Sequence, residues 1–475
     1  MFKLNLIKDL KLMSKELKFK MFSGIILLLF VLSGIASVYS YENSMKEFNN
    51  SYLSQKKLDE GVLDKADRML GHNVNYFRIP SKFNLISEKR GFPNGLRSRL
   101  VVDDISSSGF DNHTTNYFVL NWLFIIGVIC SFSALVFSYN ALSKEKKDGT
   151  LKLKLVAGLT RHNVLYSKYI ANMIFFAITI LLGMILSILV SAIMGFSFLS
   201  NLTLWGFISL IILVFVISLV YISVFIWTGL FLSLLKNERN GIILALTCWL
   251  LIIVIIPNLT WIVGKGFYKV PSNSEMDSQA SLAWNEEFNL WCSKYDNPET
   301  MENKVGGDGY LAEGYRSGAV QASDEKMSQV QTEIGKQHLA QIEFLEKLSC
   351  ISPYSQLDKL FQLLVEQGLT TLKVEMKSLV QHRNRIEETL KSLDAGDEES
   401  LHLWYSWAGD DGSYGLNPFT TKPYTDKDNF ILTKHLEIPN RDKLKQTTPI
   451  VIIMLLMNCL IVIITLFKLK RYDVR

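Results

Sequence analysis

The chain has 475 residues, of which 49% are hydrophobic and only 20% are charged, and its mean hydropathy is +0.19. Such a chain is too apolar to remain disordered, and five cysteines are too few for a disulfide-rich secreted scaffold. The charges are gathered into clusters separated by long uncharged runs, which is not the pattern of an ordinary soluble enzyme.

Five runs without Asp, Glu, Lys or Arg stand out along the chain. They contain 21 residues after Lys20, 32 after Asp111, 67 after Lys168, 25 after Arg239 and 22 after Lys445. A helix needs about 20 apolar residues to cross the ~30 Å hydrocarbon core of a membrane. The longest run therefore holds two spans, with a break at residues 195–203, where Gly, Ser and Asn cluster.

These runs predict an all-α polytopic membrane protein with six transmembrane helices and a mainly helical extracytoplasmic domain. The spans are expected at 21–41, 117–141, 169–194, 203–235, 241–264 and 448–467. The first span could instead be a cleaved signal peptide. Its apolar run is longer than usual, however, and no small-x-small site closes it. We therefore expect an uncleaved anchor.

The distribution of Lys and Arg predicts the orientation. The segments expected inside are 1–20, 142–168, 236–240 and 468–475, and those expected outside are 42–116 and 265–447. The inside segments hold 19 basic and 6 acidic residues, whereas the outside segments hold 31 basic and 39 acidic ones. Because basic loops remain in the cytoplasm, both termini are predicted to be cytoplasmic.

Residues 1–20 show a helical pattern of their own. Leu6, Leu10, Met13 and Leu17 fall on one face, and lysines fill much of the remainder. This pattern predicts an interfacial amphipathic helix that leads into the first span. It could serve as a membrane anchor or as a collar against a cytoplasmic partner, and the pattern alone does not separate the two.

Signatures of chemistry are missing from the chain. There is no P-loop, HExxH, GxSxG or CxxC motif, so we expect no catalytic, cofactor-binding or metal residues and no enzyme activity. No expected span carries a charge or a histidine in its core, which argues against a proton-driven carrier. Pro257 is expected to kink or end the fifth span. Cys292 and Cys350 are both expected outside and could form a disulfide.

The large outer block, 265–447, has a net charge of −9. Helices are predicted at about 275–295, 324–350 and 354–394, with a bend at Gly368. A joint at Ser352-Pro353 would make the last two a helical hairpin. The tract 401–426, rich in aromatics, Gly and Pro, is expected to be a structured loop or a platform for sugar or peptide.

The smaller outer segment, 42–116, is nearly neutral. It is expected to begin with a helix at about 42–70 and to continue with turns and short strands. Its basic run from Lys82 to Arg99 is the natural electrostatic partner of the acidic block, although a solvated surface explains the run equally well.

The loop 142–168 between the second and third spans has the most specific pattern. Asp148, Gly149 and Thr150 predict a turn, and Thr160 predicts the cap of a helix that begins at about Arg161. The loop should therefore be a short helix bent back on itself at the membrane face. Such an element is fit to sit in a groove on a second protein.

This pattern resembles the ABC-2 type permeases, the membrane subunits of type V ABC exporters. In that family a glutamate, a Gly-Thr-Leu and a helix start with arginine and lysine recur between spans two and three. The matching residues here are Glu145, Gly149, Thr150, Leu151, Arg161 and Lys168, whereas Gly158 stands where the family usually has proline. The long outer block resembles the branch with an extracytoplasmic insert of unknown function between spans five and six.

The resemblance implies that those six residues couple the chain to a separate ABC ATPase subunit, which binds ATP and Mg, while this chain has no cofactor. It also implies a second permease subunit, identical or related, in a bacterial inner membrane, with membrane lipid but no nucleic acid as a partner. The uncharged spans fit an amphipathic, lipid-like or peptide cargo. The alternative is a membrane-anchored scaffold or sensor whose outer domain binds an envelope partner, which leaves the loop pattern unexplained.

Overall fold

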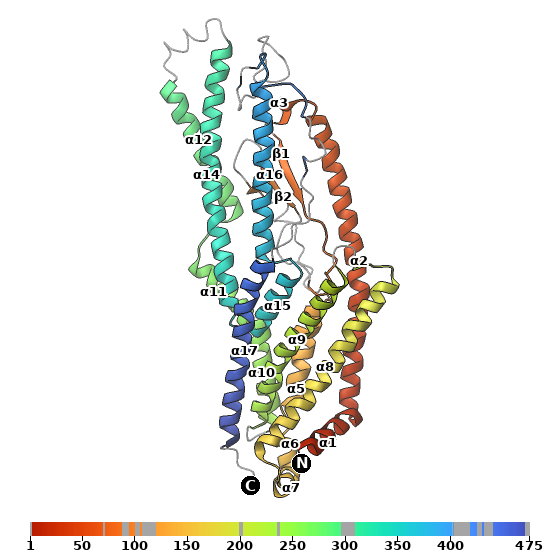
Figure 1. Cartoon of the computed structure of the whole chain (residues 1–475). Helices are drawn as coiled ribbons and strands as arrows, with labels where there is room; N and C mark the ends of the chain where they lie inside the picture. The colour runs from red at the N-terminus through yellow and green to blue at the C-terminus, as the bar shows by residue number, and fades with distance from the viewer. Residues whose placement is uncertain are drawn as a thin grey trace.

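The computed structural model describes residues 2–69, 72–87, 95–99, 105–106, 120–198, 203–234, 238–295, 309–400, 402, 419–424, 430–431 and 440–470. These residues form a helix bundle at one end of the molecule and a tall, mostly helical unit at the other (Figure 1). The all-α polytopic fold class is thereby confirmed. Most of the tract 401–426 and part of the run from Lys82 to Arg99 lie outside the described residues.

Six helical segments among the described residues are long and apolar enough to cross a membrane. They are α2 (Leu17–Val62), α4 (Trp122–Phe124) with η1 (Ile125–Cys130) and α5 (Ser131–Ser138), α8 (Arg161–Ile193), α9 (Leu204–Ser233), α10 (Glu238–Leu250) with η2 (Leu251–Ile255) and α11 (Ile256–Phe267), and α17 (Asn440–Lys470). A shorter helix, α1 (Phe2–Lys15), precedes α2. The start of α1 and the end of α17 lie at the same end of the bundle (Figure 1).

Small residues let several spans approach one another closely. A Cβ atom on Gly34 of α2 would lie 2.7 Å from the Ser187 carbonyl oxygen of α8, and one on Gly229 of α9 would lie 2.6 Å from Ser138 Cβ of α5. Ser191 Oγ also lies 3.2 Å from the Gly34 carbonyl and 3.0 Å from the Ser187 carbonyl, and it donates its single proton to one of them. In lipid, where apolar contact alone gives helices little reason to associate, such close packing holds a bundle together.

The fifth span is built differently from its neighbours. The helix does not end at Pro257 but continues to Phe267, and a π-helical turn, η2, immediately precedes the proline. Because proline has no N–H, a carbonyl one turn earlier loses its helical partner. The Ile252 carbonyl accepts a hydrogen bond from Ser352 Oγ at 2.7 Å. Ser352 therefore binds the backbone of the fifth span at this irregular turn.

A short helix, α15 (Pro353–Leu364), links the bundle to the taller unit. Its Leu357, Leu360 and Phe361 side chains are buried in the same core as the spans. Gly127, in the π-helical turn of the second span, leaves room for the Tyr354 ring, because a Cβ there would lie 2.8 Å from it. The helix α15 thus rests on both π-helical turns.

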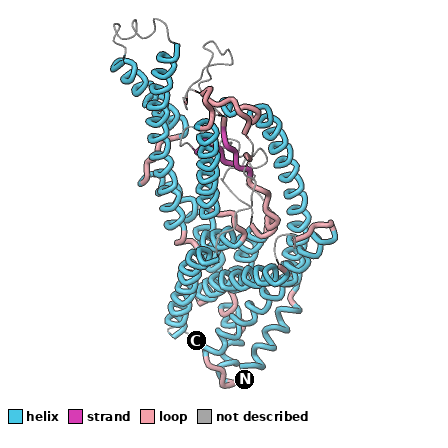
Figure 2. Tube along the Cα trace, turned by 45° about the horizontal axis from the view of Figure 1, so that its top comes forward, coloured by secondary structure: helices cyan, strands magenta, loops and turns pink. Residues whose placement is uncertain are grey.

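The distal unit comprises the end of α2, α3 (Ala66–Met69), the strands β1 (Asn73–Phe77), β2 (Gly95–Arg99) and β3 (Ile105–Ser106), α12 (Asn273–Tyr295), α14 (Gly309–Ser349) and α16 (Leu369–Ala395). The strands form an antiparallel sheet in the order β1-β2-β3. Figure 2 shows this sheet beside α16. A second hydrophobic core lies between the sheet and α16. The helix α16 contributes Leu372, Leu379 and Ile386 to this core.

The helix α14 packs along α12 (Figure 1). Trp284 Nε1 donates to Asp324 Oδ1 at 2.7 Å across this pair. The helix α16 reaches α14 through the ion pair of Lys373 with Glu343. The nearest partner of α14 is therefore α12, whereas the sequence predicts a hairpin with the helix after Ser352-Pro353. Cys350 is a free cysteine, so the disulfide considered with Cys292 is not formed.

A buried ion pair joins the two outer segments of the chain. Arg78 pairs with Glu375 of α16, and Tyr76 Oη donates to the other Glu375 oxygen at 3.1 Å. Burial lowers the pKa of Arg78 to about 10, so its guanidinium remains charged at neutral pH. The contact between the smaller outer segment and the acidic block is thus made by Arg78, which lies just outside the basic run from Lys82 to Arg99. Within that run, Lys82 Nζ donates to the Ser197 carbonyl at 3.3 Å.

Candidate functional site

The loop 142–168 folds into two short helices and the start of a third. The helices α6 (Ser143–Lys147) and α7 (Thr150–Val156) meet at Gly149, whose φ of 71° lies in the left-handed region. A side chain there is disfavoured by the backbone alone, because a Cβ would meet nothing within 4 Å. Thr160 Oγ1 accepts from the Asn163 N–H at 3.2 Å and caps α8. The predicted turn and cap are both present.

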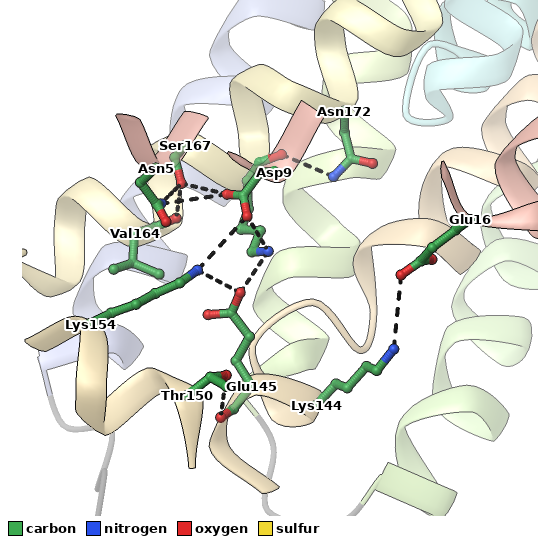
Figure 3. A network of polar contacts seen from close by, with 11 residues as sticks. Asn5, Asp9, Glu16, Lys144, Glu145, Thr150, Lys154, Val164, Ser167 and Asn172 are labelled. Carbon is green, nitrogen blue, oxygen red and sulfur yellow. Dashed lines mark hydrogen bonds and ion pairs between the residues drawn. The ribbon is translucent and has the colours of Figure 1, made fainter. Parts of the chain in front are cut away.

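Four charged side chains converge where α1, α6, α7 and α8 meet (Figure 3). Glu145 Oε1 lies 2.7 Å from the Nζ atoms of both Lys154 and Lys168. Asp9 Oδ1 lies 2.9 Å from Lys168 Nζ and 3.8 Å from Lys154 Nζ. Their exposed fractions run from 2% for Asp9 to 16% for Lys168. We call these residues the four-charge cluster. Two carboxylates and two ammonium groups balance, which is what permits burial.

Neutral polar groups complete the junction between α1 and α8. Asn5 Nδ2 donates to Ser167 Oγ at 2.5 Å. The Ser167 hydroxyl lies 2.9 Å from Asp9 Oδ2 and 3.0 Å from the Val164 carbonyl, and it donates its single proton to one of them. The buried side of α1 is therefore polar, and it holds that helix on α8 (Figure 3).

The loop is also tied back on itself. Thr150 Oγ1 donates to the Glu145 carbonyl at 3.2 Å, which links the first residue of α7 to α6. Leu151 is buried in the main core together with Leu142 and Leu159. The inner side of the loop is therefore fixed by apolar packing as well as by charge.

The outer side of α7 carries two exposed aliphatic side chains beside the exposed Lys152. Leu153 is 70% exposed and Val156 is 87% exposed. Because they are three residues apart in a helix, they lie on one side of it. Arg161 and His162, exposed at the start of α8, follow them in the chain. Exposed aliphatic side chains on a fixed support are typical of a surface that binds another protein.

The structure places all six residues expected from the sequence. Glu145 and Lys168 are in direct contact, Gly149 lies at the left-handed turn, and Thr150 bonds to the Glu145 carbonyl. Leu151 is buried in the core, and Arg161 is exposed at the first residue of α8. Glu145 points inward, where one of its oxygens binds two lysines. The loop is therefore one connected unit, but its six matching residues do not all face the same way.

Sequence reasoning missed Asp9, Lys154, Asn5 and Ser167, which complete the cluster. One signal was available. Asp9 is the only acidic residue in α1 and lies four residues after Asn5, on the same helical face. A single acid among lysines, aligned with a polar neighbour, indicates a buried polar contact.

Comparison with known proteins adds one finding. The family model described as ABC-2 family transporter protein matches residues 10–380. The matched range includes the first five spans, the loop 142–168 and the first part of α16, as far as residue 380. No curated protein and no solved structure matches the chain.

The six apolar helices define a multi-pass membrane protein. The family match covers well over half of the sequence and includes the loop that carries the candidate site. The chain therefore belongs to the ABC-2 transporter family and is a membrane subunit, the permease, of an ABC transporter.

Proposed function

We propose that this permease belongs to a type V ABC exporter and couples ATP hydrolysis on a separate ATPase subunit to transport. The cargo is amphipathic, lipid-like or a peptide, and the transporter either exports it or acts on it outside the membrane. The observation that carries the proposal is the exposed pair of Leu153 and Val156 on a loop whose other side is fixed.

Coupling needs a contact that transmits force without yielding. In this proposal Leu153 and Val156 enter a groove on the ATPase, while the four-charge cluster holds the back of the loop against α8 and α1. Gly149 sets the angle between α6 and α7. Glu145 and Lys168 then act from inside the loop rather than by pairing with the ATPase. The ATPase binds ATP and Mg, and this chain holds no cofactor.

The proposed orientation places loop 142–168, α1 and the end of α17 in the cytoplasm of a bacterium, with the distal unit outside its inner membrane. The insert between spans five and six then supplies α12, α14 and α16 of the distal unit, and the segment between spans one and two supplies α3 and the three strands. A cysteine introduced at Ser54 or Gln279 of a cysteine-free variant should react with an impermeant maleimide in intact cells. One introduced at Ser143 should not. Labelling at Ser143 alone would reverse the orientation.

A second permease subunit, identical or related, is expected to pack on the fifth span. Only 11% of the most apolar window of that span is buried within this chain, against 67% for the second span. Thr247 and Asn258 are exposed there on an otherwise apolar helix. In lipid, polar side chains on a helix surface favour contact with another helix. Membrane lipid covers the remaining apolar faces.

The decisive experiment replaces the exposed apolar pair. Tagged permease carrying Leu153→Glu and Val156→Glu would be purified from cells that also express the ABC ATPase that accompanies the wild type. We expect at least a tenfold loss of bound ATPase and of ATP hydrolysis in nanodiscs. Leu282→Glu, at an exposed leucine of α12 in the distal unit, is the matched control and should retain both. Wild-type ATPase recovery with the double variant would place the coupling contact elsewhere.

A further inference from the structure

The helix α1 exposes part of its apolar surface and buries its polar residues. Its buried residues are Asn5 and Asp9, and the Leu6, Leu10 and Met13 side chains of the predicted apolar face are only half-buried. Leu4 is 68% exposed, and Ile7 and Leu12 are exposed as well. In a soluble protein the aliphatic side chains would pack inward and the polar ones would face water. The aliphatic residues of α1 therefore need a cover that is not water.

Four lysines share this exposed surface. The outward face of α1 consists of Lys3, Leu4, Ile7, Lys8, Lys11, Leu12 and Lys15, all of which are exposed. None of its four ammonium groups makes an ion pair with a described residue, and the only acid of the helix, Asp9, points into the four-charge cluster. Like charges three and four residues apart also repel one another. The face therefore carries four uncompensated positive charges.

The position of α1 identifies what covers this face. The chain turns at Glu16, which has extended backbone angles, and α2 begins at the next residue. Figure 1 shows α1 crossing the foot of α8 instead of continuing the line of α2. Leu17, Met21, Ile25 and Leu28, spaced three or four apart, are exposed along the first turns of α2. This stripe faces hydrocarbon in a membrane, so α1 lies at the level where the lipid headgroups begin.

We propose that the outward face of α1 is a binding surface for anionic phospholipid headgroups. The lysines bind the phosphates, and the leucine and isoleucine side chains enter the boundary of the acyl chains. Each lysine near an anionic membrane surface strengthens the attraction roughly fivefold, so four of them give on the order of several hundredfold. A protein partner would not account for the continuity of this face with the lipid-facing stripe of α2.

Lipid bound here also affects the site on the other side of the helix. Asp9 and the outward lysines belong to one rigid helix of 14 residues. A headgroup layer that holds α1 in place therefore keeps Asp9 beside Lys168 and Lys154. In a membrane without anionic lipid this attraction is absent, and α1 opens more often.

Hydrogen exchange of α1 amides in the isolated permease tests this inference without any ATPase. The protein would be placed in nanodiscs of phosphatidylcholine alone and of three parts phosphatidylcholine to one part phosphatidylglycerol. We expect the anionic lipid to slow exchange in α1 at least tenfold, and the effect to collapse in high salt. A variant with Lys3, Lys8, Lys11 and Lys15 changed to Gln should show no difference between the two lipids.

A matched variant controls for the loss of four positive charges. It changes Lys46 and Lys57 of α2 and Lys326 and Lys347 of α14, all of which are exposed, to Gln and should keep the full lipid effect on α1. Equal exchange in both lipids for the wild type, or an unchanged lipid effect in the α1 variant, would overturn the inference. So would protection of α1 that appears only when the ATPase is added, because the face would then belong to the protein partner.

Discussion

Replacing Asp9 by asparagine should loosen the junction of α1 with α7 and α8. At an effective dielectric constant of about 20, opposite charges 2.9 Å apart attract by about 6 kcal/mol, and those 3.8 Å apart by about 4 kcal/mol. The cost of burying Asp9 and its repulsion from Glu145 offset much of this. Breaking a buried pair by removing one partner costs about 3–5 kcal/mol, and we expect about 3 kcal/mol because Glu145 still binds both lysines.

A loss of about 3 kcal/mol corresponds to roughly a hundredfold rise in the open population of the junction. Hydrogen exchange of α1 and α7 amides in the Asp9→Asn variant should therefore accelerate by up to that factor, while amides deep in α9 should not change. Asp148→Asn removes the same charge from an exposed position of the same loop and is the matched control. Its exchange should follow the wild type.

The second part of the test restores the charge balance. Adding Lys154→Met to Asp9→Asn leaves one carboxylate, Glu145, with one ammonium group, Lys168. The double variant should recover about 2 kcal/mol of the loss, because the two sites share a partner and are not additive. If Asp9→Asn exchanged like the wild type, or if the second change added a further loss, the four-charge cluster would not be what holds the loop.

Three other outcomes follow from the structure. Gly149→Val forces a β-branched residue into a left-handed turn at a cost of about 1–2 kcal/mol, so the variant should insert normally but recover less ATPase than the wild type. Glu375→Gln leaves the buried Arg78 guanidinium uncompensated, and scanning calorimetry should show the distal unit unfolding earlier, by about 3 kcal/mol of stability. Gly127→Val displaces the Tyr354 ring and should lower the melting temperature, which Tyr354→Ala in the same chain should partly restore.

The membrane architecture was predictable because it depends only on the order of apolar and charged residues along the chain. An uncharged run of sufficient length must lie in lipid, and six such helices are present. The turn at Gly149 and the cap at Thr160 were predictable for a related reason, since each depends on backbone chemistry within a few residues.

The cluster partners were harder to predict because they are distant in sequence. Asp9 meets Lys168 from 159 residues away, and no local pattern encodes that contact. The pairing of α14 with α12 depends in the same way on the three-dimensional path of the chain. The sequence predicts a span at 21–41 and a helix at about 42–70, and the structure joins the two in one helix that ends at Val62, since residues 42–60 contain no Gly or Pro to interrupt it.

In the bundle, α2 and α8 are continuous helices, whereas the second and fifth spans are irregular. The loop 142–168 is bound to α8 through the four-charge cluster. The helix α2 runs without interruption for 46 residues, about 69 Å, and packs tightly along α8. Its distal end enters the second core, where His72 Nε2 lies 2.6 Å from Asp59 Oδ1. The second and fifth spans instead contain π-helical turns, which cost helical hydrogen bonds and allow bending. If the ATPase pushes on the loop as proposed, we expect the push to reach the distal unit through α8 and α2, and we expect the π-helical spans, which α15 contacts, to be the ones that bend.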